Sequence, residues 1–146
     1  MAKLYIICID DQREVLNTVV KDLESFEKFF VVEACESAIE AWELIEEIDE
    51  EGDQLALVVS DHVMPDKSGV QFLTELYEDG RFALTRKILL TGLATHKDTI
   101  TAINKAKIDT YIEKPWKKEQ LLGDAKKMLT LFVLDAGLNY EKYMDA

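Results

Sequence analysis

Cysteine and histidine are scarce in this sequence, with two of each among its 146 residues. Cys8 and Cys35 lie in or beside short apolar segments, and neither has a Cys-x-x-Cys partner or a histidine nearby. This usage favours buried free thiols and argues against a zinc site. His62 and His96 have no neighbouring partner that suggests catalysis or metal binding, so we interpret them as a loop residue and a helix-start residue.

Long hydrophobic runs are also missing. No segment approaches the roughly 20 apolar residues of a membrane-spanning helix. The N-terminal apolar segment after Lys3 is too short, and too soon followed by acidic residues, for a secretory signal peptide. We therefore expect a cytoplasmic protein with no membrane partner.

Positive charge is in short supply. Lys and Arg total 17 against 29 Asp and Glu, which gives a net charge of −12. Phosphate backbones attract basic surfaces, so direct nucleic-acid binding by this chain is not expected. Many of the acids fall in residues 43–53, which we interpret as a solvated helix end and loop rather than a metal site.

Short apolar segments alternate with amphipathic ones along the chain. The apolar segments predict strands over residues 3–9, 30–34, 55–60, 87–90 and 109–113. Residues with helical spacing predict helices over 12–28, from Ser37 to about Gly52, from Ser68 to about Gly80, over 95–107, and from Trp116 onward. Ser37 is a candidate N-cap with Glu40 completing a capping box. The alternation predicts an α/β fold with a parallel sheet and helices on both faces.

Reactive polar residues follow four of the five predicted strands. Because a parallel sheet brings its carboxyl ends to one edge, these residues are expected to meet. They are Asp10, Asp11, Asp61, Thr91 and Lys114. Three carboxylates at one edge would repel one another unless a cation lay among them, and oxygen-only ligands favour Mg²⁺. With a lysine and a hydroxyl nearby, this set suits phosphoryl transfer to an aspartate.

Read one at a time, these residues have simpler explanations. Asp10 and Asp11 could be an N-cap and a first-turn acid of the following helix. Thr91-Gly92 could be an ordinary turn, and Tyr111 a plain half-buried strand residue. Trp42 and Trp116 are most simply packing residues.

Taken together and in order, the motifs resemble the receiver domain of two-component response regulators. The resemblance rests on Asp10-Asp11, on the segment SDHVMPDKSG from Ser60, on LLTG from Leu89 and on YIEKPW from Tyr111. It covers about residues 3–132. It implies a CheY-like, flavodoxin-like (βα)5 fold, doubly wound, with strand order 2-1-3-4-5. We expect a receiver domain over residues 1–133 and a short C-terminal extension over 134–146, with no output domain.

The resemblance also implies a role for each matching residue. Asp61 matches the phosphorylated aspartate, and Asp10 and Asp11 the metal-binding acidic pair. The set is completed by the Val63 backbone carbonyl as a further Mg²⁺ ligand, Thr91 and Lys114 as phosphoryl contacts, Thr91 and Tyr111 as switch residues, and Pro115 after a bond that is typically cis in the family. The implied partner is a sensor histidine kinase or a histidine phosphotransfer protein.

In this family, phosphorylation of the aspartate shifts the surface made by the fourth helix, fifth strand and fifth helix. We therefore expect a signalling receiver that catalyses only its own phosphorylation and dephosphorylation, with an unknown downstream protein target. A homodimer through the same surface stays open. Val63 and Leu93 lie two residues past Asp61 and Thr91, at positions that flank the acyl phosphate. Both are apolar and cannot orient water, so we expect slow hydrolysis.

Two other functions remain as alternatives. A Mg²⁺-dependent aspartyl-nucleophile phosphatase would share this chemistry, but such enzymes usually carry a DxDx[TV] sequence on the first strand, which Asp10-Asp11-Gln12 does not match. A docking module that never needs phosphate is the other alternative, and the intact acidic set argues against it. Past the receiver, Gly137 is expected to end a helix and Asn139 to cap a further short helix with Tyr140 and Tyr143 on its apolar face.

Overall fold

A five-stranded parallel sheet forms the centre of the protein. The computed structural model describes residues 2–92 and 97–144. The strands lie in the order β2-β1-β3-β4-β5, which confirms the predicted fold. In chain order the elements are β1 (Leu4–Ile9), α1 (Arg13–Asp22), β2 (Val31–Cys35), α2 (Ala38–Glu50), β3 (Gln54–Asp61), α3 (Gly69–Glu78), β4 (Arg86–Thr91), α4 (Lys97–Lys105), β5 (Thr110–Glu113), α5 (Lys118–Asp135) and α6 (Tyr140–Met144), with 3-10 turns at Glu24–Lys28 and Gly80–Phe82.

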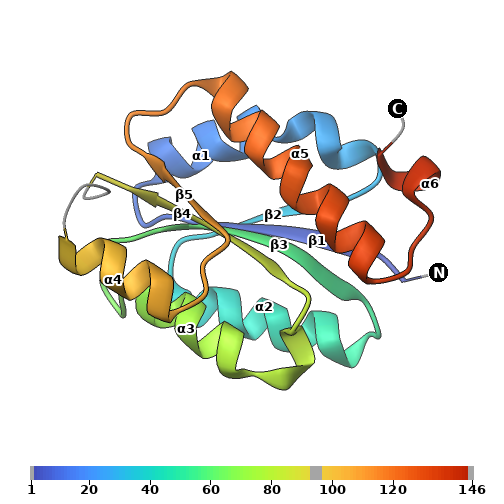
Figure 1. Ribbon diagram of the computed structural model, residues 1–146, viewed down its shortest axis with the longest axis horizontal. Helices are drawn as coiled ribbons and strands as arrows, with labels where there is room; N and C mark the ends of the chain where they lie inside the picture. Colours follow the sequence, from blue (N-terminus) through green and yellow to red (C-terminus); the bar gives the residue numbers. More distant parts are fainter. Residues whose placement is uncertain (1, 93–96, 145–146) are drawn as a thin grey trace.

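Helices cover both faces of the sheet. Helices α1 and α5 lie on one face, α2, α3 and α4 on the other, and α6 packs beside the end of α5 (Figure 1). The central strand β3 is buried from Leu55 to Asp61 and supplies both layers. Its Leu57 and Val59 join the α1/α5 core, whereas Val58 joins the α2/α3 core. A strand buried on both faces carries the continuous apolar run seen in the sequence.

The first helix is shorter than predicted. It ends at Asp22, and a 3-10 turn over Glu24–Lys28 takes the place of the last part of the predicted 12–28 helix. Leu23 is fully buried, and Phe26 packs against the same core. Apolar residues three apart fit a 3-10 turn as well as an α-helix, so their spacing did not distinguish the two. Phe30 closes this turn, because its N–H bonds to the Phe26 carbonyl, and β2 therefore begins at Val31.

The predicted helix ends are largely confirmed. Ser37 caps α2 by accepting from the Glu40 N–H at 3.1 Å. The capping box is altered, since the Glu40 carboxylate accepts from the N–H of Glu36 rather than that of Ser37. Gly52 follows α2 with a φ of +76°, a left-handed conformation that glycine adopts without strain. The predicted start of the fourth helix at Thr95 lies outside the described residues.

The C-terminal segment folds back onto the α1/α5 layer. Gly137 has a φ of +71° and ends α5, and the Leu138 N–H bonds to the Val133 carbonyl at 2.9 Å. Asn139 caps α6 by accepting from the Lys142 N–H, as predicted. The buried residue of α6 is Met144, and Tyr143 packs against the same core as predicted, whereas Tyr140 is 40% exposed, so its predicted place on the apolar face is wrong. Over the described residues, none of the helices combines the length and apolarity that crossing a membrane requires.

Candidate functional site

Three carboxylates meet at the carboxyl edge of the sheet. Asp10 follows β1 and Asp61 ends β3, and these two strands are neighbours paired through Ile9 and Ser60. Asp11 lies one residue beyond Asp10. One oxygen from each of the three carboxylates lies within 4.8 Å of the others. The predicted acidic cluster is therefore present.

Asp10 is only 1% exposed, and hydrogen bonds fix its position. Its N–H donates to the Cys35 carbonyl, and its Oδ1 accepts from the Gln12 N–H at 2.9 Å. This second bond shows that Asp10 also shapes the turn into α1, but the simpler reading of Asp10 and Asp11 as N-cap and first-turn acid is wrong, because Gln12 is the N-cap residue and Glu14 the acid of the first turn. Asp11, in contrast, is exposed to solvent.

Lys114 brings a positive charge into this cluster. Its Nζ lies 2.5 Å from Asp61 Oδ1 and 3.4 Å from Asp10 Oδ2. Its backbone N–H donates to the Thr91 carbonyl, which ties the end of β5 to the end of β4. The Lys114–Pro115 peptide bond is cis. Strands β3, β4 and β5 thus place the Asp61 carboxylate, Thr91 and the Lys114 ammonium group at one edge.

The electrostatics of the cluster favour a further cation. Burial raises the pKa of Asp10, and the nearby Asp61 carboxylate raises it further. The hydrogen bond from the Gln12 N–H and the positive charge of Lys114 both lower this pKa, but it stays above the usual value for an aspartate. A single lysine therefore does not fully offset the buried negative charge. Hard oxygen ligands beside a solvent-accessible hollow suit Mg²⁺, which keeps several waters. The residues present fit such an ion, and the acidic triad is typical of the Mg²⁺ site of receiver domains.

A hollow of about 340 Å³ lies over these groups. Asp61, Thr91 and Lys114 line it, together with Asp11 and Val63. Thr91 is 1% exposed, so its position is set by packing at the end of β4. Val63 is 67% exposed, which leaves its side chain open to solvent in the hollow that Asp61 also lines.

Among the described residues predicted for the site, Asp10 and Tyr111 are not part of the lining of this hollow. Tyr111 lies on β5 beside Leu89, is 42% exposed and is absent from the lining. Leu93, predicted to influence hydrolysis, lies outside the described residues. The metal-ligand, phosphoryl-contact and switch roles therefore remain predictions.

Asp66 is a structural residue of the site that the sequence analysis missed. Its carboxylate accepts from the N–H groups of Ala38 and Ile39 at 3.3 and 2.9 Å, so it caps α2 from the β3–α3 loop. Partial burial opposes ionisation, but these backbone donors and the Lys67 N–H lower the pKa of Asp66 overall. Its partners lie 27 and 28 residues earlier in the chain, and no local pattern signals a cap at that distance.

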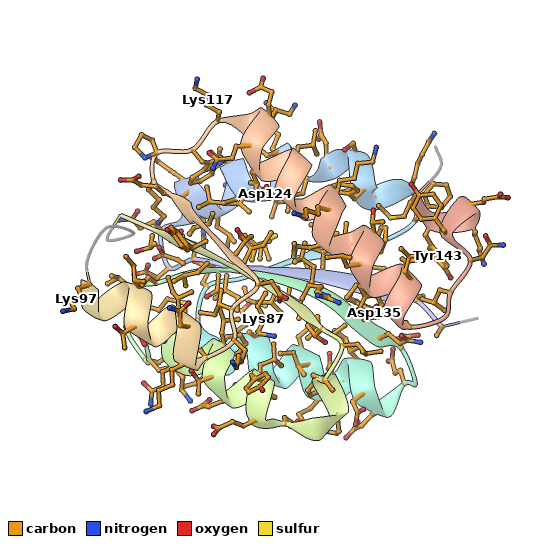
Figure 2. The ribbon with its side chains drawn as sticks, in the orientation of Figure 1. Lys87, Lys97, Lys117, Asp124, Asp135 and Tyr143 are labelled. Atoms are coloured by element: carbon orange, nitrogen blue, oxygen red, sulfur yellow. The ribbon has the colours of Figure 1, made fainter. Side chains whose placement is uncertain are left out.

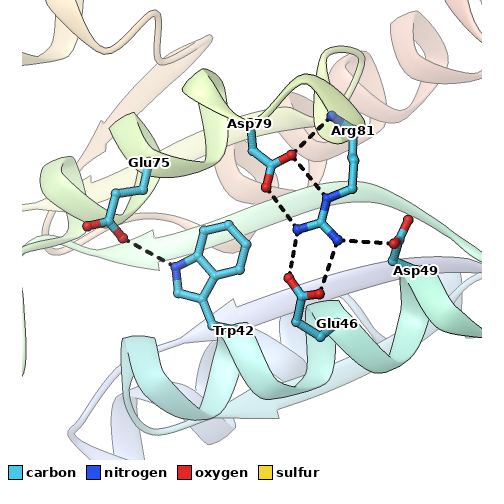
Figure 3. Close-up of polar contacts among 6 residues, drawn as sticks. All are labelled: Trp42, Glu46, Asp49, Glu75, Asp79 and Arg81. Carbon is cyan, nitrogen blue, oxygen red and sulfur yellow. Dashed lines mark hydrogen bonds and ion pairs between the residues drawn. The ribbon is translucent and has the colours of Figure 1, made fainter.

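Polar contacts of α2 and α3 also hold the β3–α3 loop in place. Trp42 Nε1 donates to Glu75, which also accepts from Lys67 Nζ at 2.7 Å. Farther along, Arg81 bridges carboxylates of α2 and the end of α3, namely Glu46, Asp49 and Asp79 (Figure 3). These contacts fix α2 and α3 as a unit behind the site.

Trp116 performs a similar role on the opposite face. Its Nε1 donates to Asp22 at the end of α1, at 3.0 Å. The loop that follows Lys114 is thereby joined to α1. Both tryptophans pack as predicted, and both also donate a hydrogen bond that the sequence could not show.

Known proteins resemble the chain over most of its length. The response regulator receiver domain family matches residues 6–126. The hydrogenase transcriptional regulatory protein HoxA of Bradyrhizobium diazoefficiens is 31% identical over 88% of this chain and 24% of its own length. The response regulator Rre1 of Synechocystis is 30% identical over 85% of this chain and 51% of its own. The chain thus spans about half or less of the length of these two relatives.

Solved structures show the same arrangement of elements. A CheY-like receiver domain protein from Methanospirillum hungatei superposes with a TM-score of 0.75 at 25% identity, covering 92% of this chain and 99% of that one. Receiver domains are signalling modules partnered by histidine kinases. Together with the acidic triad and Lys114 at the expected strand ends, the match over residues 6–126 shows that this chain belongs to the response regulator receiver domain family.

Proposed function

We propose that this chain is a phosphorylation switch in which Asp61 accepts a phosphoryl group from the phosphohistidine of a sensor histidine kinase or a histidine phosphotransfer protein. An Asp61 carboxylate oxygen attacks phosphorus, a P–O bond forms, and the P–N bond breaks with its electron pair leaving on the histidine nitrogen. The observation that carries the proposal is the ion pair of 2.5 Å between Asp61 and Lys114 beside two further carboxylates. Because the Lys114 ammonium group already lies beside Asp61, it can bind the phosphoryl oxygens as negative charge develops on them.

The predicted site residues have distinct parts in this transfer. Asp10, Asp11, Asp61 and the Val63 backbone carbonyl would hold Mg²⁺. When bound, the ion supplies positive charge that neutralises the phosphoryl oxygens. Asp10 is preset by its bond from Gln12, so little reorganisation is required. The Thr91 hydroxyl donates to a phosphoryl oxygen, and Lys114 Nζ binds another.

Phosphorylation then shifts the balance between two states of the domain. Formation of the acyl phosphate, a mixed anhydride, removes the carboxylate charge of Asp61 and adds a dianionic group, so Lys114 changes its partner. Thr91, whose carbonyl already accepts from the Lys114 N–H, moves toward the phosphoryl group. Tyr111 turns inward from its exposed position on β5. The surface of α4, β5 and α5 changes accordingly and binds a downstream protein or a second copy of the chain.

Intact-protein mass spectrometry after incubation with acetyl phosphate tests the proposal. We expect one phosphoryl adduct in Mg²⁺, none in EDTA and none in Asp61→Asn. Asp124→Asn, on α5 away from the hollow, should label as the parent protein does. An Mg²⁺-independent adduct, or one that survives in Asp61→Asn, would contradict the assignment. If neither acetyl phosphate nor a set of purified histidine kinases labels the protein, the phosphorylation proposal is wrong and the docking-module alternative is correct.

A further inference from the structure

A hollow lined by aromatic side chains lies between the 3-10 turn that follows α1, the middle of α5, and α6. It has a volume of about 220 Å³ and is bordered by Phe26, Phe30 and Tyr143. The rings touch one another, because the centroid of Phe30 lies 6.4 Å from that of Phe26 and 6.1 Å from that of Tyr143. Such pairs hold aromatic side chains in fixed orientations.

A second hollow, of about 360 Å³, adjoins the first. It shares Phe29, Phe30 and Tyr143 with it and continues to the start of β1 and β2. Phe29 borders both hollows and is 37% exposed. The two hollows together are termed the aromatic groove, defined by Phe26, Phe29, Phe30 and Tyr143.

Lysines surround the aromatic groove although the protein as a whole is acidic. Lys126 borders the first hollow, and Lys3, Lys28 and Lys142 border the second. Lys142 also lies 5.3 Å from the centre of the Tyr143 ring. Glu27 is the carboxylate found among the lining residues of the two hollows. The chain carries 17 basic and 29 acidic residues, so this local excess of positive charge is opposite to the average.

The groove lies far from the phosphoacceptor hollow. Tyr143 and α6 lie at one end of the molecule, whereas Lys97 and Lys117, at the starts of α4 and α5, lie at the other (Figures 1 and 2). Among residues 2–92 and 97–144, none borders both the groove and the hollow beside Asp61. The proposed phosphotransfer therefore gives the groove no role.

We propose that the aromatic groove docks a short acidic segment of a partner protein, with one aromatic or large aliphatic side chain inserted in the 220 Å³ hollow. The hollow is smaller than the 300–1,000 Å³ usual for small-molecule sites, and suits one anchoring side chain. Carboxylates on either side of the anchor pair with Lys126 and with the lysines of the second hollow. Complementary charge speeds the encounter and fixes the orientation.

Charge also disfavours two other occupants. A second copy placed on the groove by two-fold symmetry would set lysines against lysines. A polynucleotide would meet the groove lysines but also the field of a protein with a net charge of −12, which repels an extended polyanion. A short acidic segment covers only the lysine-lined region.

The probe is an N-acetylated, C-amidated pentapeptide with a central phenylalanine and two aspartates on each side, titrated into the ¹⁵N-labelled full chain. We expect amide shifts confined to residues 2–4, 25–31, 122–126 and 140–144. Replacing the phenylalanine of the probe by alanine, or its aspartates by lysines, should abolish them. Shifts elsewhere, or none at millimolar peptide, would overturn the proposal, as would tighter binding of oligothymidylate or of anionic lipid vesicles than of the peptide.

Charge-reversal variants give the second arm of the test. Lys126→Glu should weaken binding roughly tenfold. Lys118→Glu, on the same helix about two turns earlier, should leave it unchanged. Phe29→Ala should also lower the affinity, since its ring borders both hollows. Equal weakening by Lys118→Glu would mean that net charge alone attracts the peptide. Acetyl-phosphate labelling of Asp61 should be normal in all three variants, which separates this proposal from the phosphorylation itself.

Discussion

A β-carbon on Gly69 would collide with the backbone carbonyl of Asp61. It would lie 2.9 Å from the carbonyl carbon of Asp61 and 3.0 Å from Cα of His62, with the carbonyl oxygen closer still. The Gly69 N–H donates to the His62 carbonyl at 2.7 Å, which fixes this approach. The first turn of α3 therefore packs directly against the backbone that carries Asp61, the proposed phosphoacceptor.

Replacing Gly69 by alanine should damage both stability and labelling. The obstructing atoms belong to the backbone, so β3 or α3 must shift, and we expect a loss of about 1–3 kcal/mol in the free energy of unfolding. Labelling of Asp61 should slow as its carboxylate is displaced. Urea titration and acetyl-phosphate labelling measure the two effects. As a control, Gly123→Ala on α5 has open space around it and should instead stabilise by about 0.5–1 kcal/mol.

Magnesium should stabilise the protein through the acidic triad. At tenfold its dissociation constant, an ion that binds only the folded state adds about 1.4 kcal/mol to the free energy of unfolding. In Asp10→Asn we expect most of this gain to disappear. Without metal the same variant should be more stable than the parent, because a buried carboxylate next to Asp61 is removed while the bond from Gln12 can persist. Thermal unfolding in Mg²⁺ and in EDTA tests both statements. An equal magnesium shift in Asp10→Asn would exclude Asp10 as a ligand.

Lys87 should make stability depend on pH above neutrality. It is 5% exposed, and burial lowers its pKa, although the Asp109 carboxylate 3.8 Å away opposes this. Between the folded pKa and the usual value of 10.5, the unfolded chain binds the extra proton. Raising the pH through this window therefore stabilises the folded state. The free energy of unfolding of the parent minus that of Lys87→Met should rise as pH increases toward 10.5. A difference that does not change with pH would contradict a lowered pKa of Lys87 in the folded protein.

Hydrolysis of the phosphorylated protein should be slow, because Val63 offers no polar atom to an attacking water. Val63 is 67% exposed, so substitution there leaves packing intact. Val63→Asn should accelerate loss of the phosphoryl group severalfold, whereas Val63→Leu should leave the rate slow. The decay of the adduct mass after removal of acetyl phosphate gives both rates. Equal rates in the two variants would show that another position controls hydrolysis.

Much of the fold could be predicted because its signals are local. The uninterrupted apolar run of β3, the cap at Ser37, the start of α3 after Ser68 and the end of α2 near Gly52 each depend on residues a few positions apart. The meeting of Asp10, Asp61 and Lys114 followed from topology, since parallel strands end at one edge.

Some features were missed because they depend on contacts between residues far apart in the sequence. One was predicted wrongly because two local conformations fit the same residue spacing. The 3-10 turn after Asp22 uses the same apolar spacing as the helix that was predicted there. The cap of α2 by Asp66 and the bond from Trp116 to Asp22 join segments 27 to 94 residues apart. Side-chain type indicates that such residues can bond, but the partner is decided only when the helices pack.

The sheet also separates the two thiols. Cys8 belongs to the core under α1 and α5, and Cys35 to the core under α2 and α3. Burial raises the pKa of each to about 12, so neither forms the reactive thiolate while its layer is closed. The chain thus contains two natural reporters of local opening. The rate at which a thiol reagent modifies Cys8 records excursions of one helical layer, and the rate at Cys35 records those of the other.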